Sequence, residues 1–459
     1  PYTTLFRSFM TAEIGILNRQ GVALAADSAV TIGIQGKQKV LNSANKLFNL
    51  VKGLPVGLMV YGRGDFLGIP WEIIVNEYRK NFDSNSKMKK LEDYSESFIN
   101  ELNNIKFKSN SSYRGYVDNL LATSLAEISE ETKRVLMKKY PNIEVKPTMV
   151  LKEFSEILII RINKISNLDF AKGFTDDDIE KILNDSINIE ICNENFDRLF
   201  NFKDCEQDEI IEIDKLAYSI IEDIKQLNAL TQTKDIFFDY SGIVITGFGE
   251  DELFPVLYEY YIEGIINDKL KYKLNKVTEI NSEHIEGKSS SEIIPFAQQE
   301  MVHAVLTGID PSLENLIFEN LQEIIKTTLA TVNNEFKCEN CEKKALHLVN
   351  VNNQIQAEFN NLISFINNIR RDYFVNPILE MVDLLPKDEL ATMAETLVNI
   401  TSFKRKITMD TETVGGPIDV AVISKSEGFI WIKRKYYFKP ELNRDYFLNK
   451  GADYGKDCL

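Results

Sequence analysis

The sequence has 459 residues, of which 44% are hydrophobic and 10% aromatic, and its 69 acidic and 53 basic residues give a formal net charge of −16. The length allows two or three ordinary domains or one core with large insertions, and the hydrophobic content excludes a disordered chain. The acidic balance argues against nucleic acid and anionic membrane surfaces as the main partners.

The cysteines are few and unevenly spaced, so they predict no secreted disulfide framework and favour a reducing compartment. They are Cys192, Cys205, Cys338, Cys341 and Cys458. No apolar run approaches the roughly 20 residues that a membrane span needs, and no basic-then-apolar signal peptide opens the chain. The sequence therefore predicts a cytoplasmic protein.

The first nine residues are set aside because PYTTLFRS reads as the translation of a common sequencing-adaptor oligonucleotide. The natural start is then Met10, followed at once by Thr11. The alternative is a short pro-segment that is later cleaved. Both interpretations make Thr11 the first residue of the mature chain.

Short strands are predicted first, over TAEIGILN (11–18) and GVALAADSAVTI (21–32), with a turn between them at Arg19 to Gly21. KLFNL (46–50) and VGLMVYG (56–62) predict a second hairpin. Helical spacing then predicts a helix from Gly64 to Arg79, with Phe66, Ile69, Ile73, Ile74 and Tyr78 on one side.

The stretch 81–235 is rich in Asn, Lys and Glu and predicts helices at 117–140, 148–166 and 208–229. A further helix is expected after Thr175, where three aspartates favour a helix N-terminus. Strands return at 241–249 and 254–280. Two amphipathic helices are expected at 290–309 and 311–332, and 333–404 is mainly helical with a break at Cys338 to Cys341. A final hairpin is predicted over 417–435, turning at Ser424 to Gly428.

Strands at the start, middle and end, with helical blocks between, predict an α+β fold of two antiparallel sheets covered by helices. Residues 10–80, 236–332 and 405–438 would form the core. Residues 81–235 and 333–404 would be helical insertions, and 439–459 a C-terminal tail. A Rossmann-type domain is excluded because its strict alternation and glycine fingerprint are absent.

Removal of Met10 is permitted by the small residue that follows it. Thr11 then becomes the first residue and a candidate nucleophile. The residue then holds a hydroxyl nucleophile and a free α-amine whose reference pKa is about 7.7–8.0, so it supplies its own general base. Such a nucleophile needs a cation, a carboxylate that holds the cation, and a backbone N–H facing the oxyanion. Lys46, Asp27 and Gly62 are candidates for these three parts.

The chain resembles the proteasome β-subunit and HslV family of N-terminal-nucleophile (Ntn) hydrolases. TAEIGI, GVALAADSAVT, KLFNL and GLMVYG carry the resemblance in the family's order, and IVITGFGEDELF and VGGPIDVAVISKSEGF look like later family segments. The resemblance implies a four-layer αββα sandwich and a threonine peptidase. It makes Thr11 the nucleophile, Lys46 the pKa-lowering cation, Asp27 its partner and Gly62 the oxyanion-hole donor.

The sequence departs from the family pattern near its end. The usual serine-glycine-glycine reads Val414-Gly415-Gly416, and Thr411 stands at the usual aspartate position. Asp410 or Glu412 could replace that aspartate, and the residues do not decide between them. The altered network keeps open a small-molecule amidohydrolase with a helical lid, and a non-catalytic assembly or binding subunit.

No cofactor is expected. Cys338 and Cys341, with His347 nearby, supply half of a zinc site at most, since structural zinc needs four ligands. The interpretation favoured there is a loop with two free thiols. The expected partners are a peptide or other amide substrate and further copies of this chain, with no nucleic acid and no membrane. An ATPase partner is left open.

Overall fold

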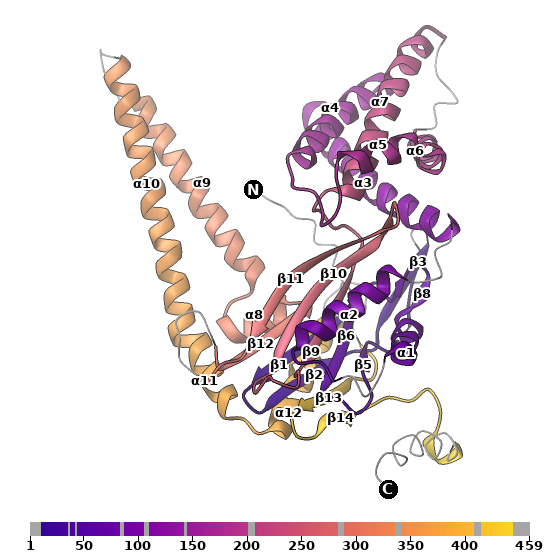
Figure 1. Cartoon of the computed structure of the whole chain (residues 1–459). Coiled ribbons are helices and arrows are strands. Elements are labelled where there is room, and N and C mark those ends of the chain that lie inside the picture. The colour runs from indigo at the N-terminus through magenta and orange to yellow at the C-terminus, as the bar shows by residue number, and fades with distance from the viewer. Residues whose placement is uncertain are drawn as a thin grey trace. The chain divides into compact units, whose positions relative to one another are not determined.

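The computed structural model describes residues 11–34, 37–41, 44–82, 87–104, 110–141, 145–200, 207–282, 289–335, 341–407 and 415–443. Over these residues the chain is α+β, with two antiparallel five-stranded sheets and many helices (Figure 1). It divides into two compact units, Pro1–Leu47 with Glu279–Leu459, and Phe48–Thr278. Each unit is built around one of the two sheets.

The sheet of the first unit has the order β12-β1-β2-β13-β14. Its strands are β1 (Ala12–Asn18), β2 (Gly21–Ala26), β12 (Ser291–Ala297), β13 (Asp419–Ser424) and β14 (Gly428–Lys433). The predicted hairpins β1–β2 and β13–β14 are both confirmed. Gly21 is required where β2 meets β13, because a Cβ there would lie 2.5 Å from the carbonyl oxygen of Ile423.

The helix predicted over 290–309 is wrong in its first half. Residues Ser291–Ala297 form the edge strand β12, and the helix α8 covers only Glu300–Thr307. Pro295 explains the difference, because proline breaks a helix interior but is accepted on a sheet edge. The strand predicted over 21–32 also divides, since β2 ends at Ala26 and β3 (Val30–Ile34) pairs with β4 (Lys37–Leu41).

Helices α11 (Asn376–Leu384) and α12 (Lys387–Ile407) pack on this first sheet. The core between sheet and helices is apolar and includes Ile14, Ile16, Ala23, Ala25, Val420, Val422, Leu390, Ala394, Leu397 and Val398. The last part of the predicted insertion 333–404 therefore covers the sheet. The division into one hydrolase core and two insertions stays a prediction.

A long helical hairpin leaves the first unit (Figure 1). It consists of α9 (Pro311–Glu335) and α10 (Cys341–Arg370), followed by a π-helical turn at Arg371–Val375. The helices lie side by side, since Arg370 pairs with Glu314 and the rings of Phe318 and Phe359 meet edge to face. The break predicted at 338–341 falls mostly outside the described residues.

The sheet of the second unit has the order β11-β10-β9-β6-β5. Its strands are β5 (Leu47–Asn49), β6 (Val56–Gly62), β9 (Ser241–Gly247), β10 (Val256–Ile266) and β11 (Lys269–Glu279). Helices α1 (Trp71–Asn81) and α2 (Leu91–Asn103) share a core with these strands.

The helix predicted from Gly64 starts later than expected, at Trp71. The residues before it form a short ribbon of β7 (Asp65–Phe66) and β8 (Ile69–Pro70), and Pro70 fits the start of a helix because its φ is already helical. Ile73, expected on the buried side, is exposed.

Five helices form a bundle with its own apolar core. They are α3 (Asn110–Lys139), α4 (Pro147–Ser166), α5 (Asp176–Asn184), α6 (Ser186–Leu199) and α7 (Gln207–Thr233). The helix start predicted after Thr175 is confirmed, and the backbone N–H of Thr175 donates to Asp178 at 2.9 Å. Among the described residues, no helix is both long and apolar enough to cross a membrane. Each unit thus has a sheet and a helical layer, and the stacking into a four-layer sandwich stays a prediction.

Candidate active site

The candidate site contains a buried hydroxyl group, on Thr11, and a buried carboxyl group, on Glu13, which form a hydrogen bond. Thr11 precedes β1, and Glu13 is the second residue of that strand, so the two side chains lie on one face because strand side chains alternate. The Thr11 hydroxyl Oγ1 donates to Glu13 Oε2 at 3.0 Å. Thr11 is 4% exposed and Glu13 is fully buried.

Lys46 extends this pair into an ionic cluster. Its side chain, just before β5, lies between two fully buried carboxylates. The ammonium Nζ is 3.0 Å from Glu13 Oε1 and 2.5 Å from Asp27 Oδ1. Two acidic groups therefore share one lysine in a buried site, where charges interact more strongly than at a surface.

Asp27 holds three segments together. Its Oδ1 accepts from Lys46 and, at 3.3 Å, from the backbone N–H of Ala12. Its Oδ2 accepts from the backbone N–H of Gly415 at 2.9 Å. The strand end GVALAAD, the lysine and the Gly415-Gly416 stretch, which the sequence assigns to one site, therefore meet at this carboxylate.

The cluster shifts the pKa values of its members. Burial raises the pKa of Glu13, the positive charge of Lys46 opposes this, and the charge of Asp27 adds to it, so that the pKa is about 7. Burial by itself would lower the pKa of Lys46, but the charges of Glu13 and Asp27 outweigh it and hold the pKa above its ordinary value. Near neutral pH, Lys46 is charged and Glu13 can gain or lose a proton.

A second lysine lies close to the cluster. Lys435, just after β14, places its ammonium 2.7 Å from Asp419 Oδ2, and Asp419 is the first residue of β13. Burial lowers the pKa of Lys435, Asp419 opposes the shift, and the positive charge of Lys46 adds to it. The region around Asp27 and Asp419 therefore holds two buried or half-buried cations.

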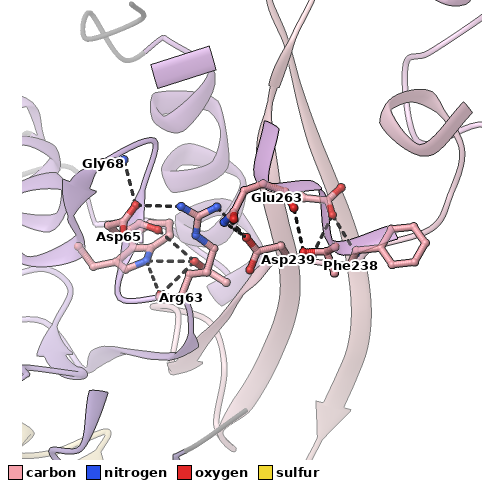
Figure 2. A network of polar contacts seen from close by, with 10 residues as sticks. Arg63, Asp65, Gly68, Phe238, Asp239 and Glu263 are labelled. Atoms are coloured by element: carbon pink, nitrogen blue, oxygen red, sulfur yellow. Dashed lines mark hydrogen bonds and ion pairs between the residues drawn. The ribbon is translucent and has the colours of Figure 1, made fainter. Parts of the chain in front are cut away.

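Gly62, the predicted oxyanion-hole donor, ends β6 in the second unit with a φ of +80°, which favours glycine. The chain after it is fixed by polar contacts (Figure 2). Arg63 pairs with Asp65 at 3.3 Å and with Asp239 at 3.2 Å. Glu263 accepts from the backbone N–H groups of Phe238 and Asp239. Gly62 itself lies opposite Ser241 in the pairing of β6 with β9, and its role in catalysis stays a prediction.

The structure brings together Thr11, Asp27 and Lys46, which the sequence places 35 residues apart at most. Glu13 links them and was missed by the sequence reasoning. Its signal was an acidic residue in an otherwise apolar strand, two positions after Thr11 and therefore on the same face. Asp410 and Glu412 lie outside the described residues.

No metal site is found among the described residues, where no three His, Cys, Asp or Glu side chains gather. Cys338 lies outside them. Cys192 is a buried free thiol in α6, and burial raises its pKa to about 12, so it is unreactive near neutral pH.

A polar pocket of about 190 Å³ lies in the first unit. Gln298 lines this pocket, and its backbone N–H donates to the carbonyl oxygen of Thr11 at 3.3 Å. Gln298 also accepts from Arg405 of α12 at 2.9 Å, and Lys404 pairs with Asp310 across the pocket lining. The pocket is smaller than the roughly 300–1,000 Å³ of drug-sized sites.

Neither a protein-family model nor a curated protein sequence matches this chain. Among solved structures, the chain is similar to Anbu (ancestral beta-subunit) from Yersinia bercovieri, at 8% identity over 97% of this chain and 96% of that chain. The TM-score of this match is 0.25. A match at this level transfers neither fold nor residue roles, and the functional argument rests on the geometry around Thr11.

Proposed function

We propose that this chain is an N-terminal-threonine hydrolase that cleaves amide bonds, with Thr11 as the nucleophile and peptides as the first substrate class to test. The supporting observation is the buried contact of the Thr11 hydroxyl with a carboxyl group that shares Lys46 with Asp27. Nucleophilic hydroxyl groups in enzymes commonly lie beside buried titratable groups whose pKa values the surroundings have shifted.

The simplest scheme has four parts. Thr11 Oγ1 attacks the amide carbonyl, and the α-amine of a first-residue Thr11 serves as general base and then protonates the leaving amine. Lys46 stays charged and stabilises negative charge that develops at the hydroxyl. Asp27 fixes Lys46 and the backbone beside Thr11. The N–H of Gly62 is assigned to the oxyanion, and water finally clears the acyl-enzyme.

Hydrolysis of fluorogenic peptide amides tests this proposal. Thr11→Ala should abolish turnover, and Thr11→Ser should retain a measurable fraction because serine keeps a hydroxyl. The matched control is Thr132→Ala, which removes another buried hydroxyl, bonded to the carbonyl oxygen of Ile128 in α3. Turnover that survives Thr11→Ala would overturn the assignment of the nucleophile.

A small-molecule amidohydrolase is the second candidate, which the departure from the family pattern at Gly415-Gly416 keeps open. Short acyl amides and dipeptides, assayed beside longer peptides, separate the two substrate classes. A larger kcat/KM for substrates no bigger than a dipeptide would favour the small-molecule function. If neither class turns over, the assembly-subunit interpretation takes first place.

We also propose that the chain forms a homo-oligomer through the α9–α10 hairpin. That hairpin exposes large apolar side chains, and extended apolar patches mark protein–protein contacts. They include Leu313, Leu316, Ile317, Ile324, Val349, Leu362 and Phe365. Light scattering on Leu316→Glu with Phe365→Glu should give a smaller particle than wild type. Ile160→Glu is the control, since Ile160 is an exposed residue of α4. A monomeric wild type would contradict the proposal.

A further inference from the structure

We propose that Glu13 is a catalytic residue that takes the hydroxyl proton of Thr11 during attack, while the α-ammonium group of Thr11 donates the proton to the leaving amine. This inference rests on the proposed function, since it needs Thr11 as nucleophile, and it changes which group is the base. It follows from the only carboxyl group that the described structure bonds directly to the Thr11 hydroxyl.

The geometry fits proton transfer. The distance from Thr11 Oγ1 to Glu13 Oε2 is 3.0 Å, within the roughly 2.6–3.2 Å expected of a general base. The second oxygen, Oε1, forms an ion pair with Lys46 Nζ at 3.0 Å, which leaves Oε2 available to the hydroxyl. Thr11 and Glu13 lie on the same face at the start of β1, so their hydrogen bond forms without movement of another helix or strand.

The surroundings of Glu13 suit a base that works near neutral pH. Lys46 and Asp27 act on Glu13 directly, and the neighbouring pair of Lys435 and Asp419 adjoins them, since Lys435 interacts with both Lys46 and Asp27. The balance of burial, Lys46 and Asp27 sets the pKa of Glu13 at about 7. A free α-amine, with a reference pKa of about 7.7–8.0, is mostly protonated at that pH and suits the role of acid. Neighbouring groups with different environments commonly divide the acid and base roles in this way.

The protons balance over one turnover. The Thr11 O–H proton moves to the Glu13 carboxylate as the Oγ1–C bond forms, and the α-ammonium proton moves to the amine as the C–N bond breaks. Water then attacks the ester, giving a proton to the α-amine. Glu13 returns its proton to Oγ1 as the C–O bond breaks, and the products are an acid and an amine.

Acylation of Thr11 by a β-lactone, followed by intact mass between pH 5 and 9, tests the assignment. The wild-type rate should rise with pH as Glu13 loses its proton. Glu13→Gln should slow acylation about 10²-fold or more and remove that rising limb, because a positioned base contributes about 10²–10⁴-fold. Glu13→Asp, which keeps a carboxyl, should restore part of the rate and a rising limb.

The control is Glu259→Gln in β10, a buried glutamate bonded to Tyr61 and to Asn275. It should label at the wild-type rate. A Glu13→Gln protein that labels as fast as wild type, or more slowly but with the same rising limb, overturns the base assignment and leaves the proposed function standing. A wild-type protein that never labels at Thr11 overturns the proposed function itself.

Discussion

Replacement of Lys46 by methionine would leave the carboxylates of Glu13 and Asp27 buried without their shared cation. Both are fully buried, and the Lys46 side chain is itself 6% exposed. Breaking a buried ion pair by removing one partner costs about 3–5 kcal/mol. Lys80→Met is the exposed control, since Lys80 pairs with Glu77 at the surface and such pairs are worth about 0–1 kcal/mol.

Hydrogen exchange followed by mass spectrometry reports this loss locally, on peptides that cover β1 and β2. A loss of 3 kcal/mol in local stability speeds exchange about 150-fold when the amides open and close rapidly. The loss should be largest near pH 8 and shrink toward pH 5, because the unpaired Glu13 carboxyl group can take up a proton.

Lys271→Met is a second control from the other unit, where Lys271 is fully buried and lies 2.6 Å from Glu263. It should speed exchange in β10 and β11 and leave β1 and β2 unchanged. Exchange of β1 and β2 in Lys46→Met within about threefold of the Lys80→Met protein would refute the ionic description of the cluster.

Three further predictions concern stability. Leu390→Ala should cost about 2–5 kcal/mol, because Leu390 is fully buried where α12 packs on the sheet, and urea denaturation measures it. Asn18→Ala should cost about 1–3 kcal/mol by the same assay, since the buried Asn18 amide donates to two backbone carbonyls at the end of α11, each at 2.9 Å. Glu13 keeps its proton in the fold to about pH 7 but only to about 4.5 when unfolded, so raising the pH across this window should cost the wild type about 3 kcal/mol. Glu13→Gln should lack that loss, and an unchanged pH dependence of its unfolding free energy would contradict the assignment of the pKa.

The sequence predicted the elements whose patterns are local. The β1–β2 and β13–β14 hairpins follow from short turns between alternating apolar stretches, and the start of α5 follows from Thr175 and the aspartates after it. The strand β12 was mistaken for a helix because a short apolar run such as EIIPF fits either period. The late start of α1 reflects the β7–β8 ribbon, which is too short to leave a pattern.

The candidate site was predicted in part. Thr11, Asp27 and Lys46 stand out because they flank apolar strands in the order of a known family. Glu13 did not, because an isolated glutamate in a strand carries no motif and its importance comes from burial beside Lys46. The contact of Gly415 with Asp27 joins residues 388 positions apart, a distance over which no local pattern operates.

Covalent labelling of protein expressed from Met10 tests the role of Thr11 as nucleophile most directly. Intact mass and N-terminal sequencing would be recorded before and after a threonine-directed epoxyketone, a probe that reacts with both the hydroxyl and the α-amine of a first-residue threonine. We expect a chain that begins at Thr11 and gains one probe mass, and the gain should be lost in Thr11→Ala. A chain that keeps Met10, or that begins at Thr11 and is never labelled, would contradict the claim that Thr11 is an activated nucleophile.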